Sequence, residues 1–379
     1  EIASCLVGSE MCIRDSYISD IVPRKDVKLY NASQASSNFN NHIQQLGYFE
    51  RHIALPPINV GNDYKSFKEK ETGIEYLTCR LFPHKGVFKY INNMLENITL
   101  FGDIVSSKEK NVWFYNISKI NFISFWLLSI LSKKNLYVLM ADYNPERNKG
   151  ILGKLILKGI ERAKGVISLT SRCGKINQNV ICLPGIIPER KIAVAKGSLS
   201  SERVFMISGV LSKNTGIEMA LEVFSEVPEA TLVISGTGDS EIERLCKDYA
   251  NRCSNIRYYG FIEKYEDFLS LLDKSDFILS FRDPAKPVNR YNFPSKILES
   301  LALNKVVIST QEYDEIKGIN YLYVPYDKKS LTTYIRTIVS GELDYKIDRC
   351  LDNSQQLRER FTEKSWINAF KKLENDKNT

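Results

Sequence analysis

Short apolar runs recur along the second half of the chain, separated by stretches long enough to form helices. The runs are VFMISG, TLVISG, NIRYYG, FILSF, KVVIST and YLYVP, and the spacing between them leaves room for helices of about 10 to 20 residues. Strands that alternate with helices pair mostly in parallel, and the helices then cover both faces of the sheet. The pattern therefore predicts an α/β fold built on parallel sheets.

The first half of the chain repeats this alternation. Its expected strands are residues 17–22, 74–82, 111–118, 136–141, 165–170 and 179–183. At 379 residues the chain is long for a single hydrophobic core, and the segment 183–203 interrupts the alternation. We therefore expect two doubly wound, Rossmann-like domains that face a cleft. Their expected bounds are 17–190 and 200–355, and residues 356–379 are expected to contain a C-terminal helix.

The first residues carry a different signature. The segment CLVGSEMCIRDS, residues 5–16, back-translates codon by codon into the adapter of a transposase-made sequencing library. We therefore expect residues 1–16 to be a sequencing-adapter scar in place of the native start, and YISDIV after it to be a truncated first strand. The alternative is an authentic N-terminal strand.

The number and spacing of the cysteines indicate whether the protein resides in a reducing or an oxidising compartment. Without the adapter segment the chain keeps six cysteines, and none of them forms a C-x-x-C pair. The spacing therefore supports neither a zinc site nor a small disulfide framework, and we expect a reduced cytoplasmic compartment unless a signal peptide has been lost. An apolar content of 43% beside 26% charged residues is typical of a folded soluble chain.

Charge is shared unevenly between the two halves. Residues 17–196 carry 26 Lys and Arg against 14 Asp and Glu, whereas residues 197–379 carry 25 against 28. A basic first half indicates contact with something anionic, such as a membrane surface, a lipid phosphate or a nucleic acid. For any single lysine, an ordinary solvated surface is the alternative.

Two segments of the first half are apolar enough to consider for membrane contact. Residues 120–131, INFISFWLLSIL, are fewer than the roughly twenty needed to span a bilayer, so a buried core helix is favoured over an interfacial one. In residues 150–165, Lys154, Lys158 and Arg162 recur at four-residue spacing beside an apolar stripe. This second helix suits a lipid surface and a protein core equally well.

Glycines follow three successive strands of the second half. Gly209 opens GVLSKNTG, Gly236 and Gly238 lie in GTGD, and Gly260 opens GF. Glycine lets the backbone approach a ligand closely or adopt a positive φ. Because ligands of doubly wound sheets bind at the carboxyl ends of the strands, these loops predict one binding edge.

The stretch NFPSKILESLALNKVVIST, residues 292–310, is predicted to be a helix followed by a strand. Pro294 suits the first turn of a helix, and Asn304 suits a left-handed cap at its end. The buried face would consist of Ile297, Leu298, Leu301 and Ala302. The free amides at the start of this helix are therefore expected at the same edge as the glycine loops.

The first turn of this helix has the groups that a nucleotide would need. A diphosphate requires amide groups and a cation, which Ser295 and Lys296 could provide. A ribose requires an acceptor for its two hydroxyls, and Glu299 lies one turn further on. The structural alternative is an exposed ion pair between Lys296 and Glu299.

Four segments together resemble a known family. In order, GVLSKNTGIEMALEVF, TLVISGTGD, NIRYYGFIEKYEDFLSLLDKSDFILSF and NFPSKILESLALNKVVIST are similar to the C-terminal domain of GT-B glycosyltransferases of family 4, the glycosyl transferases group 1. The resemblance covers about residues 200–330. It implies an acceptor-side first domain, a second domain that binds a nucleotide-diphosphate sugar, and a final helix that crosses back to the first domain.

The resemblance also implies roles for individual residues. Glu299 matches the second glutamate of the family's E-x7-E motif and would bind the donor ribose. Lys213 lies in the loop after the first strand, where such enzymes place basic groups that stabilise the leaving diphosphate. Gly260 and Phe261 would lie near the base. The other donor-binding candidates are Gly209, Gly236, Gly238, Asn292, Ser295 and Lys296.

The chain departs from the family pattern at several positions. The first glutamate of E-x7-E falls on Tyr291, so the contact to the transferred sugar is absent or comes from Asn289 or Asn292. The family's Arg and Lys pair is reduced to Lys213, and the Gly-Gly turn after the first strand of the chain is missing. Asp142 is the best acceptor-side carboxylate for catalysis, with a structural cap as the alternative.

Together with the basic first half, the resemblance implies a glycosyltransferase of bacterial surface polysaccharide synthesis. It would move a sugar from a nucleotide-diphosphate sugar to a lipid-linked or saccharide acceptor with retention, without cofactor or metal, at the inner face of a membrane that it contacts peripherally. One alternative is a GT-B nucleotide-sugar epimerase, against which the early positions of all three histidines argue. Another is a non-enzymatic protein that binds a membrane or a nucleic acid, although no interleaved aromatic and basic motif indicates nucleic-acid binding.

Overall fold

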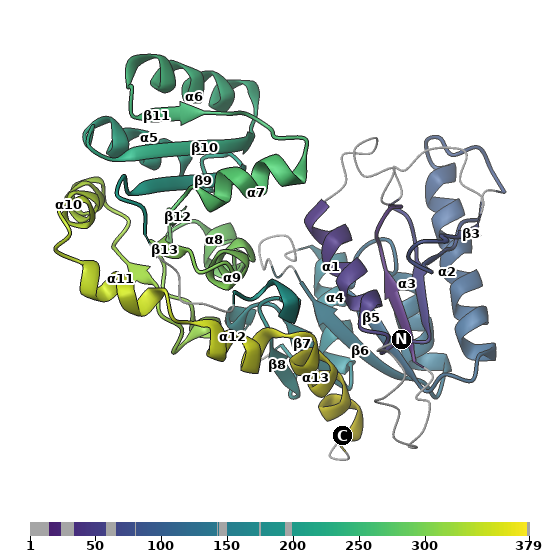
Figure 1. Ribbon diagram of the computed structural model, residues 1–379. Helices are drawn as coiled ribbons and strands as arrows, with labels where there is room; N and C mark the ends of the chain where they lie inside the picture. Colours follow the sequence, from purple (N-terminus) through teal and green to yellow (C-terminus); the bar gives the residue numbers. More distant parts are fainter. Residues whose placement is uncertain are drawn as a thin grey trace. The chain divides into compact units, whose positions relative to one another are not determined.

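The computed structural model describes residues 15–23, 34–57, 66–79, 81–141, 143, 150–173, 176–193 and 199–376. Within these residues the chain forms two compact α/β units, each with its own sheet (Figure 1). The first unit contains the described residues up to Leu169, those of Cys173–Cys182, and those from Trp366 onward. The second contains Thr170–Arg172 and the described residues of Leu183–Ser365. The expected fold class, two doubly wound α/β units, is confirmed.

The sheet of the first unit has eight strands among the described residues, in the order β3-β4-β2-β1-β5-β6-β7-β8. Neighbouring strands are parallel, except that β3 and β4 pair antiparallel. The strands are β1 (Ser16–Ser19), β2 (Arg51–Ala54), β3 (Phe67–Lys68), β4 (Glu75–Tyr76), β5 (Asn111–Tyr115), β6 (Asn135–Met140), β7 (Gly165–Ser168) and β8 (Val180–Cys182).

The predicted strand at residues 74–82 was wrong in its extent. Only Glu75–Tyr76 is a strand, and Leu81 and Phe82 beyond it are exposed. Its partner strand β2 ends at Ala54, which pairs with Tyr76. Residues after Tyr76 therefore have no residue of β2 to pair with. The short strands β2 and β3 were not predicted.

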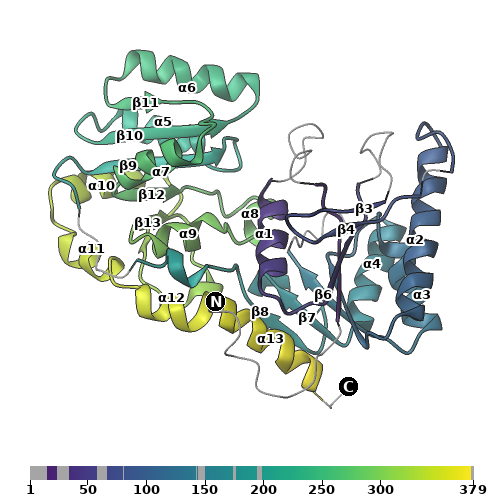
Figure 2. The same ribbon diagram turned by 45° about the vertical axis from the view of Figure 1, so that its right-hand side comes forward.

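Helices cover both faces of this sheet (Figure 2). The helices α2 (Phe88–Ser106), α3 (Phe122–Leu131) and α4 (Ile151–Arg162) lie on one face, and α1 (Gln34–Gln45) and α13 (Glu363–Asn375) lie on the other. Side chains of strand β5 alternate between the two faces of the sheet, so neighbouring residues pack against helices on opposite sides. Phe114 makes an edge-to-face contact with Phe125 of α3, with ring centroids 5.2 Å apart, and Trp113 makes one with Phe370 of α13 at 4.8 Å.

The two apolar helices considered for membrane contact differ in their packing. Phe125 and Leu128 of α3 are fully buried, as expected for a core helix. The apolar stripe of α4 is divided, since Ile156 and Ile160 are buried but Ile151 is 82% exposed. None of the described helices is both long enough and apolar enough to span a membrane.

The described part of the chain opens on a buried acidic residue. Asp15 is fully buried beside Glu374 of α13, and burial together with the charge of Glu374 raises the pKa of Asp15 to about 7. Glu374 accepts hydrogen bonds from Tyr48 Oη at 2.5 Å and Trp113 Nε1 at 2.7 Å. Strand β1 begins at Ser16, the last residue of the expected adapter segment, and residues 1–14 lie outside the described residues.

The sheet of the second unit has six strands among the described residues, in the order β11-β10-β9-β12-β13-β14, and every neighbouring pair is parallel. All six strands expected in this half form. They are β9 (Val204–Val210), β10 (Thr231–Thr237), β11 (Ile256–Tyr258), β12 (Phe277–Ser280), β13 (Val306–Ser309) and β14 (Leu322–Tyr323). The first strand, β9, lies between β10 and β12, so the strand order reverses there.

Helices also cover both faces of the second sheet. One core cluster joins the sheet to α5 (Ile217–Ser225), α6 (Ser240–Arg252), α10 (Lys328–Val339) and α11 (Asp344–Cys350). On the other face lie α7 (Tyr265–Asp273), α9 (Lys296–Ala302) and α12 (Ser354–Phe361). The short helix α8 (Pro287–Tyr291) precedes α9. Because the crossovers change sides at β9, the carboxyl ends of β9 and β12 form the topological switch point of this sheet.

Candidate functional site

Lys296 and Gly209 meet at the carboxyl end of β9. Lys296 Nζ donates a hydrogen bond to Ser208 O at 2.9 Å, and Gly209 has a positive φ of 107°. A Cβ atom on residue 209 would lie 2.0 Å from Lys296 Nζ, so only glycine leaves room for the ammonium group. The first residue of α9 therefore reaches the end of the central strand, and the structure brings together two residues that lie far apart in the sequence.

The other predicted glycines also lie at the carboxyl edge of the second sheet, and each has different surroundings. Gly236 has a φ of 141°, and a Cβ there would lie 1.8 Å from Gly209 O, so glycine allows the backbones of β9 and β10 to touch. At Gly238 the nearest atom would be Leu211 O at 2.8 Å. Gly260 has a φ of 65° with open space around it, and the next residue, Phe261, is 52% exposed.

Helix α9 has the local structure that the sequence predicts. Asn304 has a φ of 54°, which confirms the left-handed cap, and the four apolar residues assigned to the buried face are buried. Ser295 is exposed at the N-cap and makes no side-chain capping bond. Lys296 and Glu299 lie on the face that is not buried, and no ion pair joins them in the described chain, so the purely structural interpretation of this pair is not supported.

The charges of this helix are perturbed by their surroundings. Lys296 and Glu299 are both exposed side chains, although the surrounding protein removes part of their contact with water. Desolvation lowers the pKa of Lys296, and the charge of Arg282 lowers it further, whereas Glu299 opposes the shift. Desolvation raises the pKa of Glu299 against the opposing effect of Lys296 and Lys191. Perturbed pKa values of this kind concentrate at functional sites.

Lys213 lies in the loop after β9, but acidic neighbours engage it. Its Nζ forms ion pairs with Glu241 at 3.5 Å and Glu218 at 3.6 Å, and both carboxylates raise the pKa of Lys213. Both partners belong to the second unit, in α6 and α5. The structure therefore places Lys213 near the predicted edge with its charge already partly balanced.

The two asparagines considered as replacements for the family glutamate have different surroundings. Asn289 is 2% exposed, and its Nδ2 donates to Asn214 O at 2.9 Å and to Asp283 O at 3.1 Å. It thus ties α8 to the loop after β9. Asn292 has a buried Oδ1 that accepts no hydrogen bond from the described residues. Asp142, the predicted acceptor-side carboxylate, lies outside the described residues.

Sequence reasoning missed Arg282. This residue follows β12 by two positions, at the same edge as Lys296, and it is half-buried. Burial lowers the pKa of Arg282, with Tyr313 opposing, and no carboxylate of the described chain forms an ion pair with it. A basic residue directly after a strand at the switch point was the available signal, in FILSFR.

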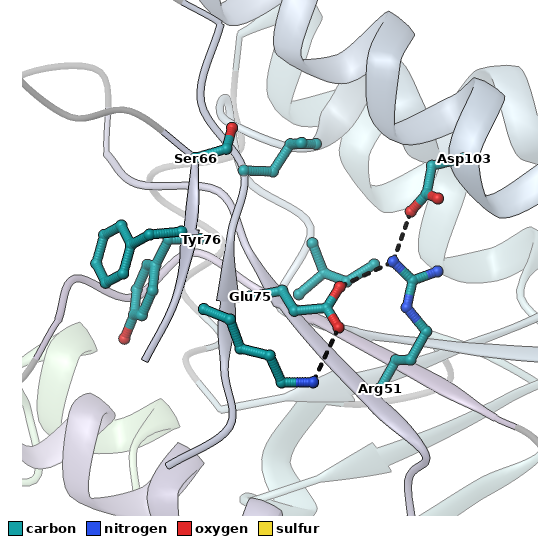
Figure 3. A pocket seen from close by; sticks show the side chains of 9 residues that line it. Arg51, Ser66, Glu75, Tyr76 and Asp103 are labelled. Atoms are coloured by element: carbon teal, nitrogen blue, oxygen red, sulfur yellow. Dashed lines mark hydrogen bonds and ion pairs between the residues drawn. The ribbon is translucent and has the colours of Figure 1, made fainter. Parts of the chain in front are cut away.

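A cavity of about 290 Å³ occurs elsewhere, in the first unit (Figure 3). Arg51 lies on one side of it and bonds Glu75 at 2.9 Å and Asp103 at 2.8 Å. The cavity lies beside the edge strands β2, β3 and β4 of the first sheet. Its two cations, Arg51 and Lys68, both form ion pairs with carboxylates, which makes it a poor anion site. Within the described ranges, no three or more His, Cys, Asp and Glu side chains gather as metal ligands.

Comparison with protein families identifies the second unit. Residues 202–340 match the family described as glycosyl transferases group 1. This range contains all six strands of the second sheet and both Lys296 and Glu299. The matched range lies within the second unit, which is therefore similar to a glycosyl transferases group 1 domain. No curated protein matches the chain by sequence.

Solved structures show that the whole chain has the GT-B fold. The chain is similar to a sucrose-phosphate synthase from Thermosynechococcus elongatus, with a TM-score of 0.67 and 11% identity over 95% of this chain and 98% of that one. A glycosyltransferase from Rickettsia africae matches with a TM-score of 0.66 and 14% identity over 97% and 100% of the two chains. WaaG, a glycosyltransferase involved in lipopolysaccharide biosynthesis, matches with a TM-score of 0.54 and 13% identity over 96% and 100%. At these identities the likeness shows the fold, two Rossmann-like domains, and the range that matches the group 1 family lies in the second of them.

Proposed function

We propose that this protein transfers a glycosyl group from a nucleotide-diphosphate sugar to an acceptor hydroxyl, and that its second unit binds the donor. The observation that carries the proposal is the position of the Lys296 ammonium, which lies over Gly209 at the switch point of the second sheet. A cation held beside exposed strand-end backbone suits the diphosphate of a nucleotide. Glu299, one helical turn further along α9, would accept hydrogen bonds from the two ribose hydroxyls.

The other residues of the donor site are proposed from their places along the same edge. Gly260 and Phe261 would lie beside the base, because open space surrounds Gly260 and the Phe261 side chain is exposed. Asn292 is proposed to contact the transferred sugar in place of the family's first glutamate, because it lies next to Tyr291, the position of that glutamate. The remaining candidates for the donor are Gly236, Gly238, Ser295 and Lys213.

The chemical contribution of the site would be electrostatic. Cleavage of the glycosidic bond to the nucleotide leaves negative charge on the departing diphosphate, and a fixed cation stabilises that charge more in the transition state than in the ground state. Lys296 is positioned for this by its hydrogen bond to Ser208 O. Retention at the anomeric carbon is proposed from the resemblance to the family, and Asp142 remains the proposed acceptor-side carboxylate.

The first unit supports a lipid-linked acceptor and peripheral contact with an anionic membrane. Around the start of α2, Leu81 and Val87 are each 72% exposed, Phe88 is 47% exposed and Tyr90 is 57% exposed. Lys85 and Lys89 flank these apolar groups in the sequence. Exposed apolar side chains beside lysines favour an interface with anionic lipid, from which an acceptor for bacterial surface polysaccharide synthesis would be taken.

The membrane contact is tested by sedimentation with vesicles. We expect more binding to vesicles that contain phosphatidylglycerol than to pure phosphatidylcholine, and a loss of binding in Phe88→Ser. Tyr345→Ser, which removes a ring that is 62% exposed in the second unit, is the matched control and should bind as the wild type does. Equal binding of all three proteins to anionic vesicles would contradict this part of the proposal.

The donor site is tested by titration with nucleotides. A panel of UDP-, GDP-, ADP-, CDP- and dTDP-sugars and the corresponding diphosphates is titrated into the protein by calorimetry. We expect one nucleotide to bind, and Glu299→Ala to weaken its affinity by about tenfold or more, since a hydrogen bond to a charged group contributes about 1.5–3 kcal/mol. The proposal is wrong if no nucleotide of the panel binds, or if Glu299→Ala leaves the affinity unchanged.

A further inference from the structure

Arg282 is a second cation at the carboxyl edge of the second sheet, two residues after β12. We propose that Arg282 and Lys296 form a cation pair that binds the diphosphate of the donor. This inference rests on the proposed function, because it names the groups that take the donor's charge. It assigns to Arg282 the role that the sequence suggested for Lys213.

Lys296 and Arg282 lie at the carboxyl ends of two neighbouring strands that pair only over part of their length. Strand β9 pairs with β10 along all seven residues from Val204 to Val210, but it pairs with β12 only through Phe205 and Met206. The strands β9 and β12 therefore separate before their carboxyl ends. Lys296 enters at the end of β9, where it bonds Ser208 O, and Arg282 follows the end of β12.

Both cations are held in place by backbone contacts on either side of that separation. Thr310 Oγ1 donates to Arg282 O at 2.6 Å, so the chain at Arg282 is fixed to the residue that follows β13. The Lys296 ammonium is fixed by Ser208 O at 2.9 Å. Neither contact uses a carboxylate, and both leave donor hydrogens of the charged groups for a ligand.

The charge at this place is only partly balanced. The charge of Arg282 lowers the pKa of Lys296 and the charge of Glu299 raises it, but no carboxylate of the described chain forms an ion pair with either cation. Arg282 is half-buried, and a half-buried cation without an ion-pair partner costs free energy. A diphosphate would supply the missing negative charge to both at once. Lys213, in contrast, has two carboxylates within 3.6 Å.

The test compares three ligands on the intact protein. The nucleoside diphosphate that binds best in the panel, its monophosphate and its nucleoside are titrated into the wild type, Arg282→Gln, Arg282→Lys and Lys213→Gln. Arg336→Gln is the matched control, because Arg336 is an exposed arginine of α10 that forms an ion pair with Glu229. Thermal unfolding of each variant confirms that it is folded before titration.

We expect Arg282→Gln to weaken binding of the diphosphate about 10- to 100-fold while binding of the nucleoside stays unchanged. Arg282→Lys should lose less, since it keeps the charge, and Arg336→Gln should behave as the wild type does. The inference is overturned if Arg282→Gln binds the diphosphate normally, if Lys213→Gln alone weakens it, or if diphosphate and nucleoside are weakened equally. Failure of the wild type to bind any nucleotide would instead overturn the proposed function itself.

Discussion

Replacing Gly209 by alanine perturbs the contact between Gly209 and Lys296, on which the proposed donor site depends. The new Cβ would lie 2.0 Å from Lys296 Nζ and 2.9 Å from Lys296 Cε, so the lysine side chain has to move away from Ser208 O. The φ of 107° at this position is one that residues with a side chain rarely adopt, so the backbone is strained as well. The substitution therefore affects stability and ligand binding through two separate causes.

The size of each effect follows from these contacts. A residue held in a sparsely populated backbone conformation costs of order 1–3 kcal/mol, so the free energy of unfolding should fall by about that amount. Displacing the ammonium group removes a charge-assisted hydrogen bond to the diphosphate, which is worth about 1.5–3 kcal/mol. At about 1.4 kcal/mol per factor of ten, the affinity for a nucleoside diphosphate should fall by about 10- to 100-fold.

Gly341→Ala separates the two causes. Gly341 has a φ of 84°, and a Cβ there would find its nearest atom, Asp344 Oδ2, at 3.5 Å, so the variant carries backbone strain far along the chain from Lys296. Urea unfolding measures the stability of both variants, and calorimetric titration measures their affinity. We expect both to be destabilised and only Gly209→Ala to lose affinity. Normal affinity in Gly209→Ala, or equal losses in both variants, would refute the reasoning.

Three further predictions concern stability. The pKa of Asp15 is raised to about 7 from its ordinary value of 3.8, so the folded state favours the protonated carboxyl. The contribution of Asp15 to the free energy of unfolding is therefore complete below about pH 4 and is lost as the pH rises through 7. Asp15→Asn should flatten the pH dependence of urea unfolding between pH 5 and 8, and an unchanged pH slope would count against this prediction. Asn289→Ala removes the side-chain donor to Asn214 O and one of the two donors to Asp283 O, which keeps its bond from Lys286 N, and should cost about 1–3 kcal/mol of unfolding free energy, whereas an unchanged melting temperature would show that the amide does not hold the loop. Asn304→Gly should be nearly neutral and Asn304→Ala should cost about 1–2 kcal/mol, because the φ of 54° suits glycine; equal stability of the two variants would argue against the left-handed cap.

The sequence was sufficient for the second unit because its elements are specified locally. Each of its six strands is a short apolar run that ends at a glycine or a loop, and all six form. Pro294, Asn304 and the apolar spacing between them define α9, whose cap and buried face are as predicted.

The first unit was less predictable because its sheet edge depends on pairing. Alternation of apolar residues continues through residues 74–82, but the length of β4 is limited by the end of its partner β2 at Ala54. Two-residue strands such as β3 carry too little pattern to recognise. The ends of these edge strands depend on which residues pair across the sheet, and the local apolar pattern of the sequence does not show that pairing.

The location of the candidate site could be predicted from the sequence, but which of its charged residues lack an ion-pair partner could not. Strand ends and glycines place Gly209, Lys296 and Glu299 at one edge, and the structure brings Lys296 onto the strand that Gly209 ends. The sequence could not show that Glu218 and Glu241 balance Lys213, or that Arg282 has no such partner. Which charges remain available to a ligand depends on contacts between segments far apart in the chain.

The most direct test of the central claim is the release of nucleoside diphosphate from nucleotide sugars. The protein is incubated with each sugar of the panel, with and without short-chain lipid and saccharide acceptors, and the released diphosphate is quantified by chromatography. We predict release from at least one donor by the wild type, and a loss of at least about tenfold in Lys296→Gln when that variant melts at the wild-type temperature. No release and no binding with any donor, or undiminished release by Lys296→Gln, would contradict the account.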